Sequence, residues 1–188
     1  MTRVIHDGQR WSNAEEDRVE LVAYDPGWPA RFEAEAGQLR AALAGIDLGP
    51  LRLEHFGSTA IPGIAAKPII DIMLVAPDPP RWPGLIEPIR SLGYVYWADN
   101  PRRDQMFFVK GMPPFGPRRS HHVHVRTPDD ARPALVFCEY LRRHPDAAAR
   151  YARLKRELEG RHPTDREAYT AGKAEFVAEI VRQANARP

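Results

Sequence analysis

"EHFGSTAIPGIAAKPIIDIML" (Glu54–Leu74) is the stretch of sequence that decides the fold. A segment of alternating residues, typical of a strand, ends at Phe56 and is followed at once by Gly57 and Ser58, which predict a tight turn. The chain then breaks at Pro62-Gly63 and enters a nearly continuous apolar run. Such a run is typical of a strand buried in the centre of a sheet.

One acid, Asp71, lies inside this apolar run. Side chains alternate along a strand, so Asp71 shares a face with Ile69 and Met73. Burying an ionised acid costs several kcal/mol unless it meets a cation, a hydrogen-bond donor or a metal. We therefore expect Asp71 to be a site residue, and the alternative is a structural acid paired with Arg126 or Lys67.

The Gly57-Ser58 turn has two interpretations. A glycine after a strand lets another group approach the backbone closely, and a short helix starting at Ser58 would turn free N–H groups and a hydroxyl outward, an arrangement that binds phosphate. The other interpretation is a capped helical turn without a ligand. A phosphate-binding turn beside a metal-binding carboxylate is the minimum apparatus for nucleotidyl transfer, because a divalent ion neutralises the triphosphate.

The whole chain is typical of one soluble globular domain. It has 188 residues, of which 43% are apolar and 28% charged, enough for one sizeable core. Residues 1–18 are polar without a period and predict a loose N-terminal arm, which leaves residues 19–188 as a single domain. The net charge of +2 is too small to predict general nucleic-acid binding.

The cysteine count and the hydropathy predict a cytoplasmic protein. A single cysteine, Cys138, excludes an internal disulfide and a zinc site made of cysteines. No apolar run approaches 18 residues, and the start does not resemble a signal peptide. We therefore expect no membrane anchor.

The order of expected elements predicts an α+β fold, an α/β sandwich in which helices flank a mixed sheet and a helical segment ends the chain. Proline, glycine and hydrophobic spacing set the boundaries. We expect a helix from Pro29 to Gly45, strands over 51–56 and 68–76, a helix over 82–92, strands over 94–97, 105–110 and 121–126, and helices from Asp130 onward, with a new helix at Pro145 and a capping box over 164–167 for the last one.

Several stretches resemble one known family. They are HFGSTAIPGIAAKPIIDIMLV, YDPGWPARFEAE, HHVHVR, FCEYLRRHPDAAARYARLKRELE and REAYTAGKAEFV. Together they cover roughly residues 19–182, and they are similar to the GrpB family, whose fold belongs to the nucleotidyltransferase superfamily. Some relatives occur fused to dephospho-CoA kinase, so the resemblance also implies a link to coenzyme A or nucleotide metabolism.

The resemblance implies roles for particular residues. Gly57 and Ser58, followed by Thr59, match the Gly-Ser turn of the superfamily, and Asp71 matches the first carboxylate of its Asp-x-Asp pair. Met73 stands where the second carboxylate would be, and a thioether is a poor ligand for a hard cation. A two-metal mechanism is therefore not expected in its usual form.

Other side chains could replace the missing carboxylate. Glu54 lies near the turn, and His122 and His124 project from one strand face together with Arg126. The predicted metal ligands are Asp71, Glu54, His122 and His124. Histidine ligands favour manganese or zinc over magnesium. An exposed edge strand without a ligand is the alternative for the two histidines.

Basic residues near these strands are candidates for phosphate binding. The pairs Arg102-Arg103 and Arg118-Arg119 lie in proline-rich loops, where arginine can bind phosphate with two hydrogen bonds. Lys173 follows Tyr169 by one helical turn and could reach a triphosphate, although it could also face solvent. The predicted phosphate-binding set comprises Gly57, Ser58, Thr59, Lys67, Arg103, Arg126 and Lys173.

These observations leave three functions open. The first is an enzyme that binds a nucleoside triphosphate and a divalent metal (magnesium or manganese, or zinc) and transfers a nucleotidyl group to a small acceptor, with Asp71 as the catalytic residue. The second is a non-catalytic module that binds a nucleotide or coenzyme A, which Met73 favours. The third is a histidine-triad hydrolase read from HHVHVR, in which Arg126 replaces the third histidine. Walker, zincin and GxSxG motifs are missing from the sequence.

Overall fold

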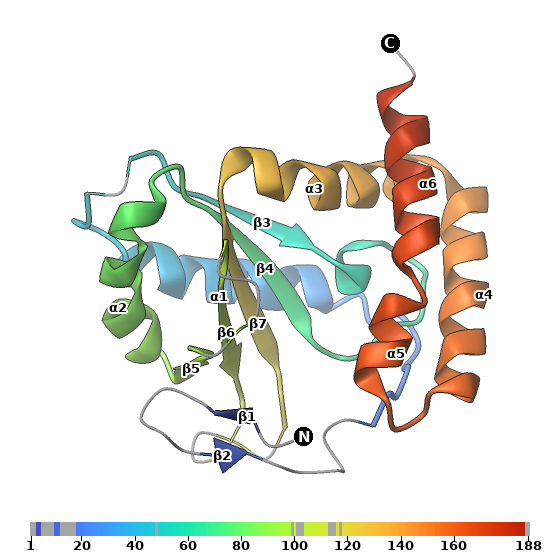
Figure 1. Ribbon diagram of the computed structural model, residues 1–188, viewed down its shortest axis with the longest axis horizontal. Coiled ribbons are helices and arrows are strands. Elements are labelled where there is room, and N and C mark those ends of the chain that lie inside the picture. The colour runs from blue at the N-terminus through green and yellow to red at the C-terminus, as the bar shows by residue number, and fades with distance from the viewer. Residues whose placement is uncertain are drawn as a thin grey trace.

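The computed structural model describes residues 3–4, 10–11, 18–47, 49–98, 100, 104–112, 116 and 118–186. Its strands and helices follow the chain in the order shown in Figure 1. They are β1 (Arg3–Val4), β2 (Arg10–Trp11), α1 (Trp28–Ala42), β3 (Arg52–Phe56), the 3₁₀ turn η1 (Ser58–Ala60), β4 (Ile70–Val75), the 3₁₀ helix η2 (Pro79–Leu85), α2 (Ile86–Arg90), β5 (Tyr94–Tyr96), β6 (Met106–Lys110), β7 (His121–Arg126), α3 (Pro128–Arg143), α4 (Pro145–Arg161), α5 (Arg166–Ala171) and α6 (Ala174–Asn185).

The centre of the fold is a mixed five-stranded sheet with the strand order β3-β4-β7-β6-β5. Strands β4 and β7 are parallel, and the other neighbouring strands pair antiparallel. The predicted α+β architecture, a mixed sheet flanked by helices, is therefore confirmed. None of the helices in the described ranges is long and apolar enough to cross a bilayer.

Helices cover both faces of the sheet. On one face, α1, η2 and α2 pack against the β4 residues Ile70, Ile72 and Leu74. On the other face, α3, α4 and α6 pack against Met73 and Val75. Figure 1 shows α4, α5 and α6 standing together beside one end of the sheet. The alternation of β4 side chains between two cores follows from the two-residue period of a strand.

The helix expected over residues 82–92 differs from the structure. The segment expected as one helix over 82–92 begins as the 3₁₀ helix η2 and becomes α-helical at Ile86, and Pro83 lies inside the 3₁₀ part. A proline in a helix interior lacks the N–H donor that the α-helical pattern needs. The structure therefore uses a tighter turn there.

The last predicted helix is divided into α5 and α6 around Gly172 and Lys173. A Cβ on Gly172 would overlap the side chain of Leu158 in α4, so a larger residue at this junction would force Leu158 to move. The N-cap is Asp165, whose carboxylate accepts a hydrogen bond from Ala168 N at 2.9 Å, and not Thr164 as the capping-box pattern predicts.

The described part of the predicted N-terminal arm contains a short antiparallel pair of β1 and β2, in which Arg3 faces Trp11 and Val4 faces Arg10. The sequence pattern did not predict this pair. The other residues before Arg18 lie outside the described ranges, so the loose arm stays a prediction.

A buried ion pair joins α1 to β6. Lys110 donates to both carboxylate oxygens of Glu35, at 2.7 and 2.9 Å, and the Glu35 side chain is 6% exposed. His121 lies on the same side of the sheet, with its Nε2 at 4.0 Å from Glu35. Because a buried carboxylate needs a partner, this pair fixes α1 against the sheet.

We predict that Lys110→Met lowers the free energy of unfolding by about 2–4 kcal/mol, because Glu35 is left buried without its partner. The double variant Glu35→Leu/Lys110→Met should recover most of the loss, since no charge remains buried. Urea denaturation followed by circular dichroism measures both values. The control Arg143→Met, which breaks an exposed ion pair with Glu139, should change the free energy of unfolding by less than about 1 kcal/mol. An equal loss in the single and the double variant would contradict this account.

Candidate functional site

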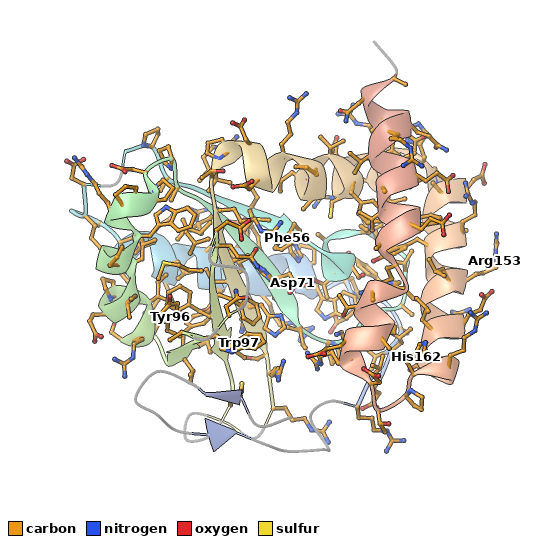
Figure 2. All side chains as sticks on the ribbon, in the orientation of Figure 1. Phe56, Asp71, Tyr96, Trp97, Arg153 and His162 are labelled. Carbon is orange, nitrogen blue, oxygen red and sulfur yellow. The ribbon has the colours of Figure 1, made fainter. Side chains whose placement is uncertain are left out.

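A cavity of about 670 Å³ opens between the sheet and the C-terminal helices. Its walls come from segments far apart in the sequence: the turn after β3, the middle of the sheet, and the helices α4 and α5. Figure 2 shows Asp71 near the middle of the sheet and Trp97 lower in the view. The lining residues are Phe56, Gly57, Ser58, Thr59, Lys67, Ile69, Asp71, Trp97, Phe107, Arg119, His122, His124, Tyr151, Arg166, Glu167, Tyr169, Thr170, Ala171 and Lys173.

Asp71 is held between two histidines. The parallel register of β4 and β7 places Asp71 opposite His122 and Met73 opposite His124. The Nδ1 of His122 lies 3.0 Å from Asp71 Oδ1 and the Nε2 of His124 lies 3.7 Å from the same oxygen. The first distance is a hydrogen bond and the second is an ion-pair separation. The ion pairs of Asp71 within 4.0 Å that involve described residues are those with these histidines.

The charge states of this cluster follow from its burial and its hydrogen bonds. Burial alone would raise the pKa of Asp71, but the hydrogen bonds and the charges of His122 and His124 outweigh it and hold the pKa well below its ordinary value. Burial lowers the pKa of His122 to about 4, although Asp71 opposes this shift. At neutral pH the cluster therefore contains an ionised carboxylate that accepts a hydrogen bond from a neutral imidazole.

The donor atoms of the three side chains are close enough to bind one ion. Asp71, His122 and His124 each offer one ligand atom, and these atoms lie within 4.8 Å of one another. Atoms about 2.1 Å from a common ion stand about 3.0–3.5 Å apart, which is near the two separations measured from Asp71 Oδ1. The Asp71 side chain keeps 27% of its surface exposed, so the cluster can be reached from the cavity.

The other nitrogens of the two imidazoles are buried. His122 Nε2 and His124 Nδ1 have no hydrogen-bond partner among the described residues. A ring nitrogen that is buried without a partner costs free energy, and metal-ligating histidines normally donate their second N–H to a neighbouring group or to water. The cluster therefore offers three side chains that could hold an ion, while one nitrogen of each imidazole stays buried without a hydrogen-bond partner in the described part of the chain.

Gly57 is required where it stands. Its φ is +73° and its ψ is −170°, a backbone conformation that is essentially confined to glycine. A Cβ at this position would lie 2.5 Å from Asp71 Oδ2. The turn and the carboxylate therefore face each other in direct contact, which is the close approach that the sequence predicts for this glycine.

Helix α3 supports the turn from behind. Arg142 donates from Nε to the carbonyl of Ala60 and from an Nη to the carbonyl of His55, both at 2.8 Å. Cys138 Sγ lies 3.8 Å from the carbonyl of Gly57. These contacts fix both ends of the turn, and the sequence pattern missed Arg142 because its partners are backbone atoms more than 80 residues away.

The predicted phosphate-binding residues are only partly brought together. Gly57, Ser58, Lys67 and Lys173 line the cavity. Thr59 also lines it, but its hydroxyl is bonded to His55 Nε2 at 3.1 Å and to the carbonyl of Ile69 at 3.4 Å, so it is already used within the fold. Arg126 stands opposite Val75 in the ladder and is not among the lining residues. Arg102 and Arg103 lie outside the described residues.

The predicted metal ligand Glu54 does not join the cluster. It stands opposite Met73 in the ladder, its side chain is 43% exposed, and it lies 3.9 Å from Arg52. Met73 itself is fully buried in the apolar layer beneath α3. The place of a second carboxylate is therefore filled by packing, and among the described residues the group that could hold an ion is Asp71, His122 and His124.

The other walls of the cavity are cationic and aromatic. Arg119, from one of the predicted arginine pairs, and Arg166 line it, and so do Tyr151, Tyr169, Trp97 and Phe107. Burial and neighbouring cations lower the pKa of Lys67 to about 7, and burial lowers that of Lys173 to about 8. The sequence pattern did not indicate that Arg166, Trp97 and Phe107 line this cavity. Arg166, Tyr169 and Lys173 are spaced by one and two helical turns, a signal that could have identified this wall.

We predict that Gly57→Ala is destabilised by about 3 kcal/mol or more, because alanine would be strained at this φ and its Cβ would overlap Asp71. Gly37→Ala is a matched control in the interior of α1, where a Cβ meets nothing within 4 Å, and it should stabilise the protein by about 0.5–1 kcal/mol through helix propensity. Denaturant unfolding measures both. A Gly57→Ala variant as stable as the wild type would refute the close approach of the turn to Asp71.

Comparison with known proteins identifies the family. A model of the family described as "GrpB protein" matches residues 18–183. UPF0157 protein PA4798 of Pseudomonas aeruginosa is 55% identical over 181 residues, which cover 95% of this chain and 72% of that protein. A protein named dephospho-CoA kinase from Mycolicibacterium paratuberculosis is 33% identical, over 88% of this chain and 46% of its own length. The crystal structure of GrpB from Enterococcus faecalis superposes with a TM-score of 0.75 and 31% identity, over 89% of this chain and 98% of that one. The chain therefore belongs to the GrpB family.

Proposed function

We propose that this protein binds a nucleoside triphosphate together with one divalent metal ion in the cavity, and that it transfers a nucleotidyl group to a small acceptor. The observation that carries this proposal is the position of the ionised Asp71, between two imidazoles and against the Gly57 turn, in a cavity whose remaining walls carry lysine and arginine. Charge of both signs at one small site suits a metal ion and a phosphate chain together.

The donor set favours particular metals. Asp71, His122 and His124 would hold the ion, and imidazole nitrogen suits manganese, zinc or iron better than magnesium, which prefers oxygen ligands. When bound, the ion would neutralise charge on the phosphates and on the attacking oxygen. The site offers one carboxylate where Met73 replaces the second, so we propose a single ion instead of a pair.

Other residues of the cavity would bind the phosphates and the base of the nucleotide. Lys67, Lys173 and Arg119 would bind phosphate oxygens, and the glycine at position 57 lets a ligand approach the backbone next to Asp71. Trp97 and Phe107 offer flat apolar surface for a base or another ring. Tight support of the turn by Arg142 would keep these groups at fixed distances, which is how most enzymes of phosphoryl chemistry obtain their rates.

The alternative is a non-catalytic module that binds a nucleotide or coenzyme A in the same cavity. Met73 favours it, because the second carboxylate of the superfamily motif is missing. The relative named dephospho-CoA kinase agrees with a phosphorylated partner of this class, and a domain like this chain makes up less than half of that protein. In either case we place the protein in the cytoplasm, where a single unpaired cysteine is expected to stay reduced.

We predict that the wild-type protein binds Mn²⁺ and that Asp71→Asn weakens this binding at least about 10-fold, because the only charged ligand is removed. Isothermal titration with Mn²⁺ measures the affinity. Glu54→Gln is the matched control, since it removes a carboxylate on the neighbouring strand outside the cluster, and it should leave the affinity unchanged. Equal weakening by both variants would show that the ion is attracted by general surface charge.

Measuring pyrophosphate release distinguishes the proposed enzyme from the non-catalytic binding module. With Mn²⁺, nucleoside triphosphates and a set of small hydroxyl- and phosphate-bearing acceptors, the wild type should release pyrophosphate, and Asp71→Asn should lose at least about 100-fold in rate while keeping its fold. Pyrophosphate release that is equal in both proteins would reject Asp71 as the catalytic residue. Nucleotide binding without any release would support the alternative module.

A further inference from the structure

Two lysines share one tyrosine ring in the cavity wall. The Nζ of Lys173 lies 4.4 Å from the ring centre of Tyr169 and the Nζ of Lys67 lies 5.3 Å from the same centre. Tyr169 is 1% exposed, so its ring is a fixed element of the wall. Lys67 comes from the segment before β4 and Lys173 from the junction of α5 and α6, so the fold brings together two ammonium groups that are remote in sequence.

These two lysines differ from the other two lysines of the chain. Lys110 is paired with Glu35, and Lys155 donates to the carbonyl of Ala65. Lys67 and Lys173 make no ion pair and no hydrogen bond with any residue in the described part of the chain, and both line the cavity. A half-buried ammonium group without an acceptor is costly, and cation–π contact with one ring recovers only part of that cost.

The surrounding charges add to the positive potential. Arg166, Arg119 and Asp71 act on Lys67, and Asp71 and Arg166 act on Lys173, while Lys155 on α4 lies close enough for Lys173 to lower its pKa. Asp71 is already held by His122 and His124. A bound anion would therefore meet two amino groups that have no carboxylate partner in the described part of the chain, and it would favour the protonated form of both lysines.

We propose that Lys67 and Lys173, which both contact the ring of Tyr169, form an oxyanion subsite that binds a phosphate group without a metal ion. The subsite rests on the proposed function for its phosphate ligand, and it adds that binding at these two lysines needs no metal ion. Its ligand class is a compound with at least two phosphate groups, one of which lies at the lysines and away from the Asp71 cluster. Lysine suits this role because its ammonium is a compact charge that binds phosphate oxygens from several directions.

The test is titration of the full-length chain with pyrophosphate at pH 7.0 in the presence of EDTA. The wild type should bind, and Asp71→Asn should bind at least as tightly, because it removes a negative charge that acts on both lysines. Lys67→Met or Lys173→Met should weaken binding at least about 10-fold. Arg153→Met is the control for charge, since Figure 2 shows Arg153 on the outer side of α4, and it should bind as the wild type does. Because both lysines are poorly solvated, the methionine variants should be at least as stable as the wild type, which thermal unfolding checks, and Lys67→Arg should retain most of the affinity.

A second arm uses sulfate, whose charge is constant between pH 6.5 and 8.5, so that any change in affinity comes from the protein. Deprotonation of the lysines above their lowered pKa values of about 7 and 8 should weaken sulfate binding at pH 8.5 relative to pH 6.5, and binding at pH 8 should take up protons. An affinity that does not change with pH would overturn the proposal. Citrate binding as tight as pyrophosphate binding would also overturn it, because general attraction of polyanions would then suffice.

The outcomes separate this subsite from the proposed function. If pyrophosphate binds only with Mn²⁺ and is lost in Asp71→Asn, the subsite is refuted and the metal-dependent site stands. If pyrophosphate binds in EDTA and depends on the lysines while Mn²⁺ does not bind, the subsite stands and the metal-dependent proposal fails.

Discussion

The contact between the Asp71 carboxylate, the two imidazoles of β7 and the Gly57 turn is the constraint on which the rest of the site depends. An ionised acid in the middle of an apolar sheet is stable only if it has polar partners. His122 supplies a hydrogen bond at 3.0 Å, and the glycine leaves room for the second carboxylate oxygen. The parallel pairing of β4 with β7 and the support of the turn by α3 both serve to keep these groups together.

Two lysines line the cavity around this contact. Lys67 and Lys173 lack acceptors in the described part of the chain, and burial lowers the pKa of both. Lys110, by contrast, is paired with the carboxylate of Glu35. An anion bound at Lys67 and Lys173 would offset the cost of holding these charges, and for this reason we propose a phosphorylated ligand.

The sequence predicts those features of the site that depend on local pattern. The two-residue period of a strand places Asp71 on the opposite face from Ile70 and Ile72, and it likewise places His122 and His124 together. The same reasoning cannot give the register between strands that are 51 residues apart, and for this reason Glu54 and His122 looked equally good as ligands of Asp71. In the structure, pairing brings His122 opposite Asp71, while Glu54 lies opposite Met73. The sequence pattern does not predict the cationic wall, because Tyr169 comes close to Lys67 only through the packing of α5 against α4.

The central claim is that Asp71, His122 and His124 together bind one metal ion inside this cavity. Pulsed electron paramagnetic resonance of the Mn²⁺-loaded protein tests it most directly, because imidazole nitrogens bound to Mn²⁺ give a nitrogen modulation that oxygen ligands do not. We expect a modulation from two directly bound imidazoles that decreases in His122→Phe and again in the His122→Phe/His124→Phe double variant. A Mn²⁺ spectrum without any histidine nitrogen, in a protein that binds the ion stoichiometrically, would contradict the account.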